Sequence, residues 1–217
     1  YGIIFSSVCG VMNGVTLLRV HLLGFFGFLN TLCMNMSSRR VKSLPRQNQL
    51  VEVVDDNLRP MAAMPEALVH RQGLLHQRVV VLIFHEQRLL YIPRRSRNYP
   101  MCPLCWDVSL SLHQKIGRSL YETARQGMMT SLGLTVSKLR FLRRLQTAQD
   151  GDNEIISVYC IASCMQQPAL NPDFFDQGMF LEAHELAYLV QSYSSQVTPL
   201  LKKLWELDVL FALVDRE

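Results

Sequence analysis

"WDVSLSLHQKIGRSLYETARQGMMTSLGL", residues 106–134, decides the fold. Apolar and polar residues alternate over residues 106–112, which is the pattern of a strand with one buried face. After a polar loop, apolar side chains recur every four positions through residues 118–134, which predicts an amphipathic helix. Gly133 follows the last apolar position and is suited to end that helix in a left-handed conformation. The stretch therefore predicts a strand, a loop and a helix in that order.

Further strands and helices are predicted on both sides of this stretch. Apolar β-branched runs bounded by turn residues predict strands, and apolar stripes with a helical period predict helices. This order of elements indicates an α+β domain, with a mixed sheet covered by helices on both faces. The predicted strands are residues 49–56, 77–85, 88–95, 138–148 and 153–164, and the predicted helices are residues 64–74, 181–193 and 198–214.

The composition indicates a globular protein and argues against some classes of function. Of 217 residues, 49% are hydrophobic and 18% are charged, which is enough apolar material for one sizeable core. The net charge of +4 is spread along the chain, so a nucleic-acid partner is not expected. Six cysteines at irregular spacing do not match a small disulfide-rich secreted domain, and a cytoplasmic location is expected.

Residues 1–40 form an apolar leader that differs from the domain expected over residues 41–217. Three interpretations of the leader stay open: an upstream extension foreign to the fold, a membrane or interfacial anchor, or a packed N-terminal helix. Arg19 divides it into apolar pieces shorter than the roughly 20 residues of a membrane span. A membrane partner is expected only if the leader is an anchor. Deleting residues 1–36 is expected to move the melting temperature by only a few degrees.

Several segments between Gln49 and Trp205, taken in order, resemble the Nudix family. They are closest to the branch of isopentenyl-diphosphate isomerases and their hydrolase-like relatives. The resemblance implies an α+β fold in which a Nudix-like mixed β-sheet is sandwiched between helices. The segments that carry it are "LLHQRVVVLIF", "LLYIPRRSRNYP", the "WD-x-S" that follows, "FLEAHELAYLV" and "VTPLLKKLW".

The signature of that family, G-x5-E-x7-R-E-U-x-E-E-x-G-U with U apolar, is largely lost here. Aligned on Gly133 and Leu134, its first glycine falls on Leu112 and its first glutamate on Arg118. The Arg-Glu pair falls on Gln126-Gly127, and the Glu-Glu pair on Thr130-Ser131. The family's glutamates hold Mg²⁺ or Mn²⁺ against a diphosphate, because hard cations prefer oxygen ligands. The resemblance therefore predicts no catalytic residue, no metal ligand and no cofactor.

The predicted helix keeps one carboxylate, Glu122, at a position that does not match the signature. At about 100° per residue, Glu122 faces away from positions 127 and 131, so it is not expected to replace their ligands. An exposed pair with Arg125, one turn further on, is the expected role. Restoring glutamate at positions 127, 130 and 131 is expected to create Mg²⁺ affinity.

Five residues are the candidates for ligand binding. Arg94, Arg95 and Arg97 follow a predicted strand end that borders the cleft of the family, and guanidinium groups bind phosphate oxygens in a forked geometry. His76 and His113 fall where the isomerase branch has metal-binding histidines, and imidazole suits an ion such as Zn²⁺. The cysteine and the late glutamate of that branch are replaced by Ser111 and Ser131. The alternative is that the arginines are solvated and the histidines have no ligand.

Cys102 and Cys105 form a C-x2-C pair with two possible kinds of chemistry. The pair is half of a structural zinc site or a redox site, and a redox pair is expected at a helix N-terminus, where the pKa of a thiol is lowered. This pair instead precedes a predicted strand. Cys160 and Cys164 are four residues apart in a predicted strand, too far apart to share one ion. Free, half-buried thiols are therefore expected.

Two functions follow from these residues. The first is a Nudix-fold protein with a degenerate Nudix box, without metal-dependent diphosphate hydrolysis, that binds a phosphorylated small molecule or a protein partner. The alternative is an enzyme, a divergent Nudix hydrolase or an isomerase-like protein acting on a nucleoside-diphosphate derivative or a prenyl diphosphate. The enzyme would draw its ligands from the histidines and from Glu154, Glu182 or Glu185. We expect the first.

Overall fold

Strand β3 (His76–Ile83) is the central strand of a six-stranded mixed sheet in the computed structural model, which describes residues 49–86, 88–147 and 153–211. It pairs in parallel with β7 (Glu154–Ile161) over its full length and antiparallel with β5 (Leu110–His113). The leader and its expected roles lie outside the described residues. The other strands, in the order β2-β1-β3-β7-β6, are β1 (Leu50–Val54), β2 (Pro60–Pro65) and β6 (Arg140–Thr147).

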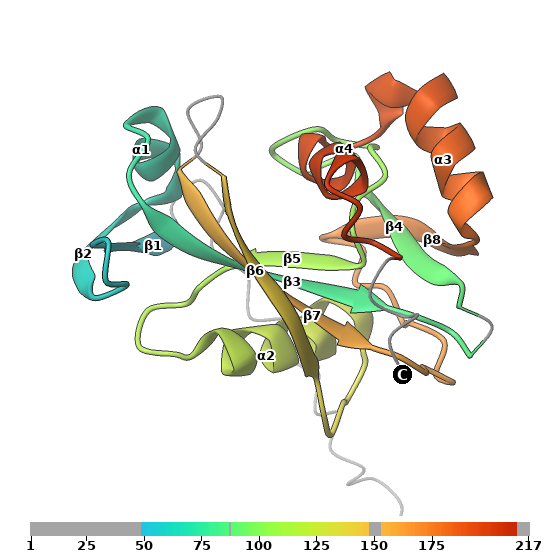
Figure 1. Ribbon diagram of the computed structural model, residues 1–217, viewed down its shortest axis with the longest axis horizontal. Helices are drawn as coiled ribbons and strands as arrows, with labels where there is room; N and C mark the ends of the chain where they lie inside the picture. The colour runs from blue at the N-terminus through green and yellow to red at the C-terminus, as the bar shows by residue number, and fades with distance from the viewer. Residues whose placement is uncertain (1–48, 87, 148–152, 212–217) are drawn as a thin grey trace, which may run out of the picture. The chain divides into compact units, whose positions relative to one another are not determined.

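The alternation of side chains along β3 sends them into two separate cores. Figure 1 shows helices on both sides of the β3 ribbon. The even-numbered residues from Val80 to Phe84 pack on one face with α3 (Ala183–Ser192) and α4 (Pro199–Glu206). The odd-numbered residues from Val79 to Ile83 pack on the other face with α2 (Leu120–Leu132). A strand buried on both faces has no polar side to alternate, which accounts for the unbroken apolar run. The predicted mixed sheet between helices is confirmed.

A second, two-stranded sheet is formed by β4 (Leu90–Arg95) and β8 (Phe175–Leu181). The sequence predicts β3 and β4 as consecutive strands across a tight connection. A bridge between Phe84 and Leu90 and a hydrogen bond from His85 N to Leu89 O close that connection, but the two strands belong to different sheets. Strand β8 was not predicted, because polar residues and Gly178 interrupt its apolar pattern. That glycine leaves room for Tyr91, whose hydroxyl would lie 2.0 Å from a Cβ at position 178.

The helix ends follow the predicted signals closely. Gly133 ends α2 with φ 64°, the left-handed conformation that glycine adopts without strain. Thr198 caps α4 by accepting a hydrogen bond from Leu201 N, and Pro199 is its first residue. The short helix α1 (Glu66–Arg71) begins directly after Pro65. Helix α4 ends at Glu206, earlier than the predicted 214.

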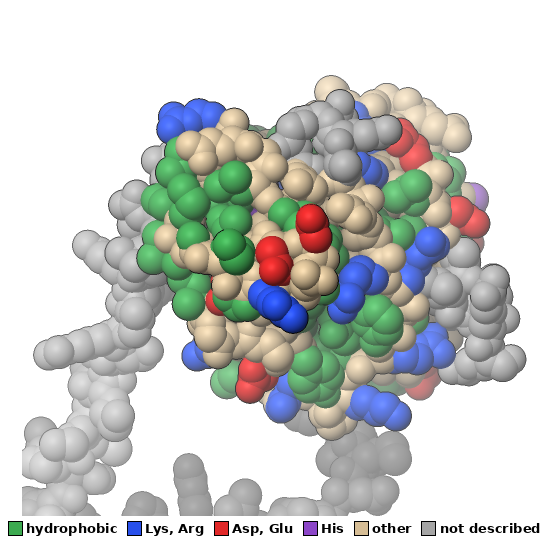
Figure 2. Space-filling view, turned by 60° about the vertical axis from the view of Figure 1, so that its left-hand side comes forward, with side chains coloured by type: hydrophobic (Ala, Val, Ile, Leu, Met, Phe, Trp, Pro, Cys, Tyr) green, Lys and Arg blue, Asp and Glu red, His purple; other side chains and the backbone are tan. Residues whose placement is uncertain are grey.

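Among the described residues, the structure contains no helix with the length and apolar character needed to cross a membrane. Figure 2 shows a face on which hydrophobic side chains gather on one side, while basic and acidic side chains are interspersed over the rest. Strand β2 contributes exposed apolar residues, among them Met61, which is 68% exposed.

Candidate functional site

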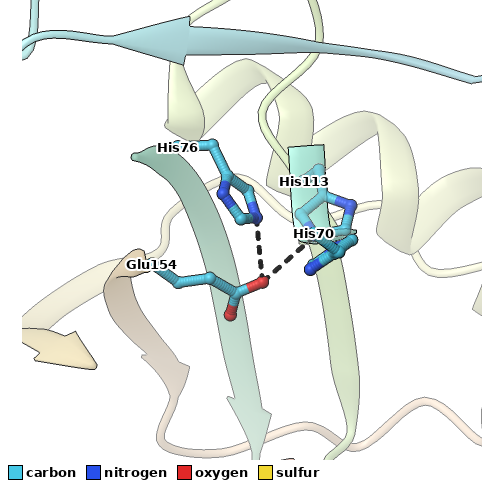
Figure 3. Close-up of side chains that lie close together, drawn as sticks. All are labelled: His70, His76, His113 and Glu154. Carbon is cyan, nitrogen blue, oxygen red and sulfur yellow. Dashed lines mark hydrogen bonds and ion pairs between the residues drawn. The ribbon is translucent and has the colours of Figure 1, made fainter. Parts of the chain in front are cut away.

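Three histidines and one glutamate from four different elements meet at one end of the sheet (Figure 3). His70 lies in the last turn of α1, His76 begins β3, His113 ends β5 and Glu154 begins β7. The three imidazole rings form a nearly equilateral triangle, with centroids 4.9 to 5.0 Å apart. One ligand atom from each of the four residues lies within 4.8 Å of the others. We call these four residues the histidine cluster.

The strand register explains why these residues meet. The parallel pairing of β3 and β7 places His76 directly beside Glu154. The antiparallel pairing of β3 and β5 places Arg78 directly opposite His113. Because side chains alternate along a strand, His76 and Arg78 share the face of β3 that packs with α3 and α4. The histidine cluster therefore lies on the opposite face of the sheet from α2.

The hydrogen bonds of His76 determine which of its ring nitrogens carries a proton. Nδ1 lies 2.8 Å from the carbonyl oxygen of Leu74, which only accepts, so this nitrogen is the donor. In the neutral ring, Nε2 then has a lone pair and faces Glu154 Oε1 at 3.0 Å. Two acceptors at this distance repel unless a proton or another cation lies close to both. The arrangement therefore requires positive charge beside Glu154 Oε1.

The guanidinium group of Arg78 supplies positive charge at that point. Arg78 Nη2 lies 2.6 Å from both Glu154 Oε1 and His113 Nε2, and Arg78 Nε donates to Glu154 Oε2 over 2.8 Å. Nη1 donates to Ser111 Oγ over 2.9 Å, so all three guanidinium nitrogens are bonded. Because Nε2 of His113 accepts a hydrogen bond from Arg78, the proton of the His113 ring is on Nδ1. This Nδ1 lies 3.5 Å from Glu66 Oε1.

The charges in this cluster shift the pKa values of its members in consistent directions. Burial would raise the pKa of Glu154, but the charge of Arg78 and the hydrogen bonds to the cluster hold that pKa far below its usual range. Burial and the nearby Arg78 charge lower the pKa of His113. Burial also opposes ionisation of Glu66, but its contact with His113 outweighs this effect and lowers its pKa. At neutral pH the histidine cluster, together with its neighbours Arg78 and Glu66, therefore holds two carboxylates, one guanidinium and a neutral His113.

This donor set suits a borderline divalent cation such as Zn²⁺, which prefers imidazole and carboxylate ligands. A tetrahedral ion with bonds of about 2.0 Å holds neighbouring ligand atoms about 3.3 Å apart. Glu154 Oε1 lies 3.0 Å from His76 Nε2 and 3.2 Å from His113 Nε2, close to that spacing. The position between these atoms, however, is the one that Arg78 Nη2 approaches. The ligands fit an ion only if the guanidinium moves away.

Helix α2, on the other face, has apolar packing at Gly127, one of the positions where the resembled signature has a carboxylate. A Cβ built on Gly127 would lie 2.0 Å from Leu112 Cδ1 and 3.2 Å from Leu110 Cδ2. Leu112 is aligned with the first glycine of the signature, so its side chain fills the space that a residue larger than glycine at position 127 would need. Ser131 is 2% exposed. A glutamate at 127 would therefore have to displace the end of the Leu112 side chain, and the Mg²⁺ affinity expected of the three glutamates stays a prediction.

Two cations lie beside α2, close to the signature's lost glutamates. Lys115 Nζ donates to Gln126 Oε1 over 3.3 Å, and Arg118 Nη1 contacts the same oxygen. Burial and the charge of Arg118 lower the pKa of Lys115, so the two cations affect each other. Glu122 does not pair with Arg125 as expected; its carboxylate accepts from the backbone N–H and hydroxyl of Ser119 and caps α2.

Sequence comparisons connect the chain with one superfamily. No protein-family model matches it. It is 28% identical over 142 residues to an uncharacterized Nudix hydrolase of Nostoc sp., covering 64% of this chain and 83% of that protein. It is 26% identical over 119 residues to an isopentenyl-diphosphate Delta-isomerase of Mycolicibacterium vanbaalenii, covering 52% of this chain and 66% of that protein.

The fold agrees with these sequence relatives. The crystal structure of DR0079 from Deinococcus radiodurans superimposes with a TM-score of 0.64 at 20% identity, covering 73% of this chain and 98% of that one. The chain is thus similar in sequence to Nudix proteins and has the Nudix fold. Helix α2 is the helix on which the resembled signature was aligned, and the histidine cluster lies across the sheet from it.

The predicted arginines of this Nudix domain are not gathered around the histidine cluster. Arg94 donates two hydrogen bonds to Asp176, at 3.0 and 2.8 Å, and its guanidinium lies 5.8 Å from the centre of the Trp106 ring. Arg95 is buried and bonds to Asp107. Arg97 is exposed. Carboxylates thus already bind the first two arginines, while the predicted ligand contact of all three stays a prediction.

The other candidates of the sequence fall into different roles. Cys102 and Cys105 are free thiols, partly buried, in a loop before β5, and burial raises the pKa of Cys105. Cys164 lies beyond the end of β7 rather than within a strand. Glu182 and Glu185 form the capping box of α3, so Glu154 is the one of the three proposed carboxylate ligands that joins the histidines.

Sequence reasoning identified part of the histidine cluster. His76 and His113 were predicted from the resemblance, and Glu154 was named only for the enzyme alternative. His70, Arg78 and Glu66 were missed, because the contacts depend on how three strands and a helix meet. A local signal existed for one of them: the two-residue spacing of His76 and Arg78 places both side chains on the same face of a strand.

Proposed function

We propose that this Nudix-fold protein binds a phosphorylated small molecule through basic side chains and does not hydrolyse diphosphates with a metal held by the Nudix box. The observation that carries the proposal is the packing of Leu112 against Gly127. A Cβ at position 127 would meet the end of that leucine's side chain, so a carboxylate there could bind a metal only after displacing Leu112. Thr130 adds no carboxylate either; its hydroxyl donates to the carbonyl of Gln126 over 3.0 Å.

Lys115 and Arg118 support the phosphate part of this proposal. Both contact the amide oxygen of Gln126, which has no charge to compensate them. The hydrogen bonds to Ser119 and, to a smaller extent, the charge of Arg118 lower the pKa of Glu122, but the carboxylate of Glu122 accepts its hydrogen bonds from Ser119. A phosphate bound beside these two cations would relieve their mutual repulsion, and Arg and Lys bind phosphate oxygens by charge-assisted hydrogen bonds. In this proposal the two side chains take the place of the box metal as the positive partner of the ligand.

The name of one relative guides the choice of probes. An isopentenyl-diphosphate isomerase is among the matching proteins, and its name states that it acts on a prenyl diphosphate. We therefore choose isopentenyl diphosphate and inorganic pyrophosphate as probes. Both carry a diphosphate, and a comparison of the two separates recognition of the diphosphate from recognition of the hydrocarbon.

The experiment is calorimetric titration of the purified chain with each probe, in EDTA and in Mg²⁺, beside an assay for phosphate release. Binding is expected in EDTA, with no release. Lys115→Ala and Arg118→Ala should each weaken binding by about 1.5 to 3 kcal/mol, the usual range for a hydrogen bond to a charged group. Arg125→Ala is the matched control, because Arg125 is an exposed arginine on the same helix. Equal affinity in all three variants, or turnover that EDTA abolishes, would overturn the proposal.

One observation favours the alternative function, a divergent hydrolase or an isomerase-like enzyme. The histidine cluster brings three imidazoles and a carboxylate together, and this donor set suits a divalent metal ion. The phosphate-release assay above, repeated with Zn²⁺ or Mn²⁺, tests this alternative, together with an assay for isomerised product. Product formation that Glu154→Gln abolishes would favour the enzyme.

A further inference from the structure

We propose that Arg78 is the permanent cation of the histidine cluster, so that the native chain holds no divalent ion there, and that removing the guanidinium converts the cluster into a metal site. The proposal goes beyond the proposed function and does not depend on it, because it concerns the other face of the sheet. It rests on which atoms Arg78 contacts, on how its strand holds it, and on the charge balance of the cluster.

The contacts of Arg78 are to the same atoms that a metal ion would bind. Glu154 Oε1 and His113 Nε2 both lie 2.6 Å from Arg78 Nη2. These two atoms lie 3.2 Å from each other, and Glu154 Oε1 lies 3.0 Å from His76 Nε2. An ion bonded to these three atoms would have to lie between them. The guanidinium and the ion therefore compete for the same lone pairs.

The surrounding structure holds Arg78 in this position. It lies in the central strand β3, opposite His113 in β5 and paired with Ile156 in β7, so its backbone has a neighbour on both sides. Its side chain is 16% exposed and makes hydrogen bonds through Nε, Nη1 and Nη2. A guanidinium withdrawn from the cluster would lose these bonds together. Occupation by a metal thus requires the loss of a satisfied, mostly buried network.

The charge balance also favours the guanidinium over an added ion. The ionised carboxylates of Glu154 and Glu66, which are 5% and 23% exposed, contribute two negative charges. Arg78 contributes one positive charge, because a guanidinium group is not deprotonated in proteins. A divalent ion added beside it would bring three positive charges against two negative ones. If Arg78 is replaced by a neutral residue, the same carboxylates and imidazoles have no cation and are suited to a divalent one.

The test is Co²⁺ titration of the native chain and of Arg78→Ala, followed by visible absorption, with Co²⁺ as a spectroscopic substitute for Zn²⁺. We expect no absorption band from the native chain and a saturable one-to-one band from Arg78→Ala, with affinity at least tenfold higher. Arg78→Met is the second variant if the alanine variant does not fold, because it keeps most of the side-chain volume. Arg78→Lys, which keeps the charge, should behave like the native chain.

A further variant shows whether the ion binds in the cluster. In Arg78→Ala/Glu154→Gln the band should be lost, whereas in Arg78→Ala/Glu182→Gln, which changes an exposed carboxylate of α3, it should remain. Native chain that binds Co²⁺ within twofold of Arg78→Ala, or that is purified with one equivalent of metal, would overturn the proposal. So would neutral variants that fold, as judged by circular dichroism, and bind no Co²⁺. Neither result would bear on phosphate binding beside Lys115 and Arg118, so the two proposals fail separately.

Discussion

Arg95 and Asp107 form a buried ion pair, in which Arg95 Nε donates to Asp107 Oδ2 over 2.8 Å. The second carboxylate oxygen, Oδ1, accepts from the hydroxyl of Thr198 and from the backbone N–H of Val108, each at 2.9 Å. Thr198 is the residue that caps α4. One carboxylate thus connects β4, the segment before β5, and the start of α4.

Arg95→Ala is expected to destabilise the fold by about 3 to 5 kcal/mol, because it leaves Asp107 buried without its countercharge. Arg94→Ala should cost at most about 1 kcal/mol, since the Arg94–Asp176 pair is about one-third exposed. Arg97→Ala is the exposed control, with an expected change within about 0.5 kcal/mol. Urea denaturation measures all three. Equal stability of the Arg95 and Arg97 variants would show that the buried pair does not stabilise the fold.

Glutamate at position 127 is expected to destabilise the fold by about 1 to 3 kcal/mol, the usual cost of overpacking. The cause is the 2.0 Å approach between a Cβ at position 127 and Leu112 Cδ1. In a Leu112→Ala background the cost of Gly127→Glu should fall by about 0.5 kcal/mol or more, because neighbouring residues couple. Met129→Glu is the control for adding a carboxylate to this helix, because Met129 is 64% exposed. Strictly additive free energies of unfolding would contradict the steric explanation.

Ser119→Ala should cost about 1 kcal/mol, because it removes the side chain that caps α2. Glu122→Ala should lower the thermal stability in the same direction, since its carboxylate bonds to the backbone N–H of Ser119 over 2.9 Å. Neither substitution should alter binding of pyrophosphate in the calorimetric titration. A loss of Mg²⁺ affinity in Glu122→Ala, with stability unchanged, would instead identify Glu122 as a metal ligand.

Acidification should destabilise the protein in two separate ranges of pH. The pKa of His113 is lower in the folded chain than its usual value of about 6.5, so the unfolded chain binds a proton that the folded chain does not. Stability therefore falls as the pH decreases below about 6.5. Glu154 has a depressed pKa, so its contribution is complete above about 4.3 and is lost as the pH falls further.

The measurement for this prediction is the free energy of unfolding as a function of pH. His113→Gln should flatten the slope in the upper range, and Glu154→Gln should flatten it in the lower range. Both variants will be less stable than the native chain, so the comparison concerns slopes and not absolute values. A native slope that is unchanged in His113→Gln would exclude His113 as its source.

Much of the fold could be predicted from the sequence, because periodicity and cap residues are local signals. The strand of residues 77–85, helix α2 and its end at Gly133 are all present in the structure. Strand β8 was missed, because its stability comes from pairing with β4 and not from its own apolar pattern. The separation of β3 and β4 into different sheets was also missed, since a short connection between two strands ordinarily indicates a hairpin.

The candidate site was predictable only in part, for a physical reason. Glu154 and His76 are 78 residues apart in sequence, and only the parallel register of β7 and β3 brings them together. Parallel pairing leaves no turn signal that would fix its register in advance. The Leu112–Gly127 contact shows the same difficulty, because each substitution is visible in the sequence but their packing against each other is not.

The register of β3 also limits how this protein can change over evolutionary time. The strand that supplies His76 and Arg78 to the cluster also supplies the buried residues from Val79 to Ile83 to both cores. Inserting or deleting one residue after Arg78 would turn the rest of the strand over, so that the residues now packed on α2 would face α4. A protein with such an insertion or deletion would lose the packing of both cores. Substitutions at this end of the sheet can therefore change its chemistry and keep the register of β3, whereas changes in the length of β3 would disrupt the cores.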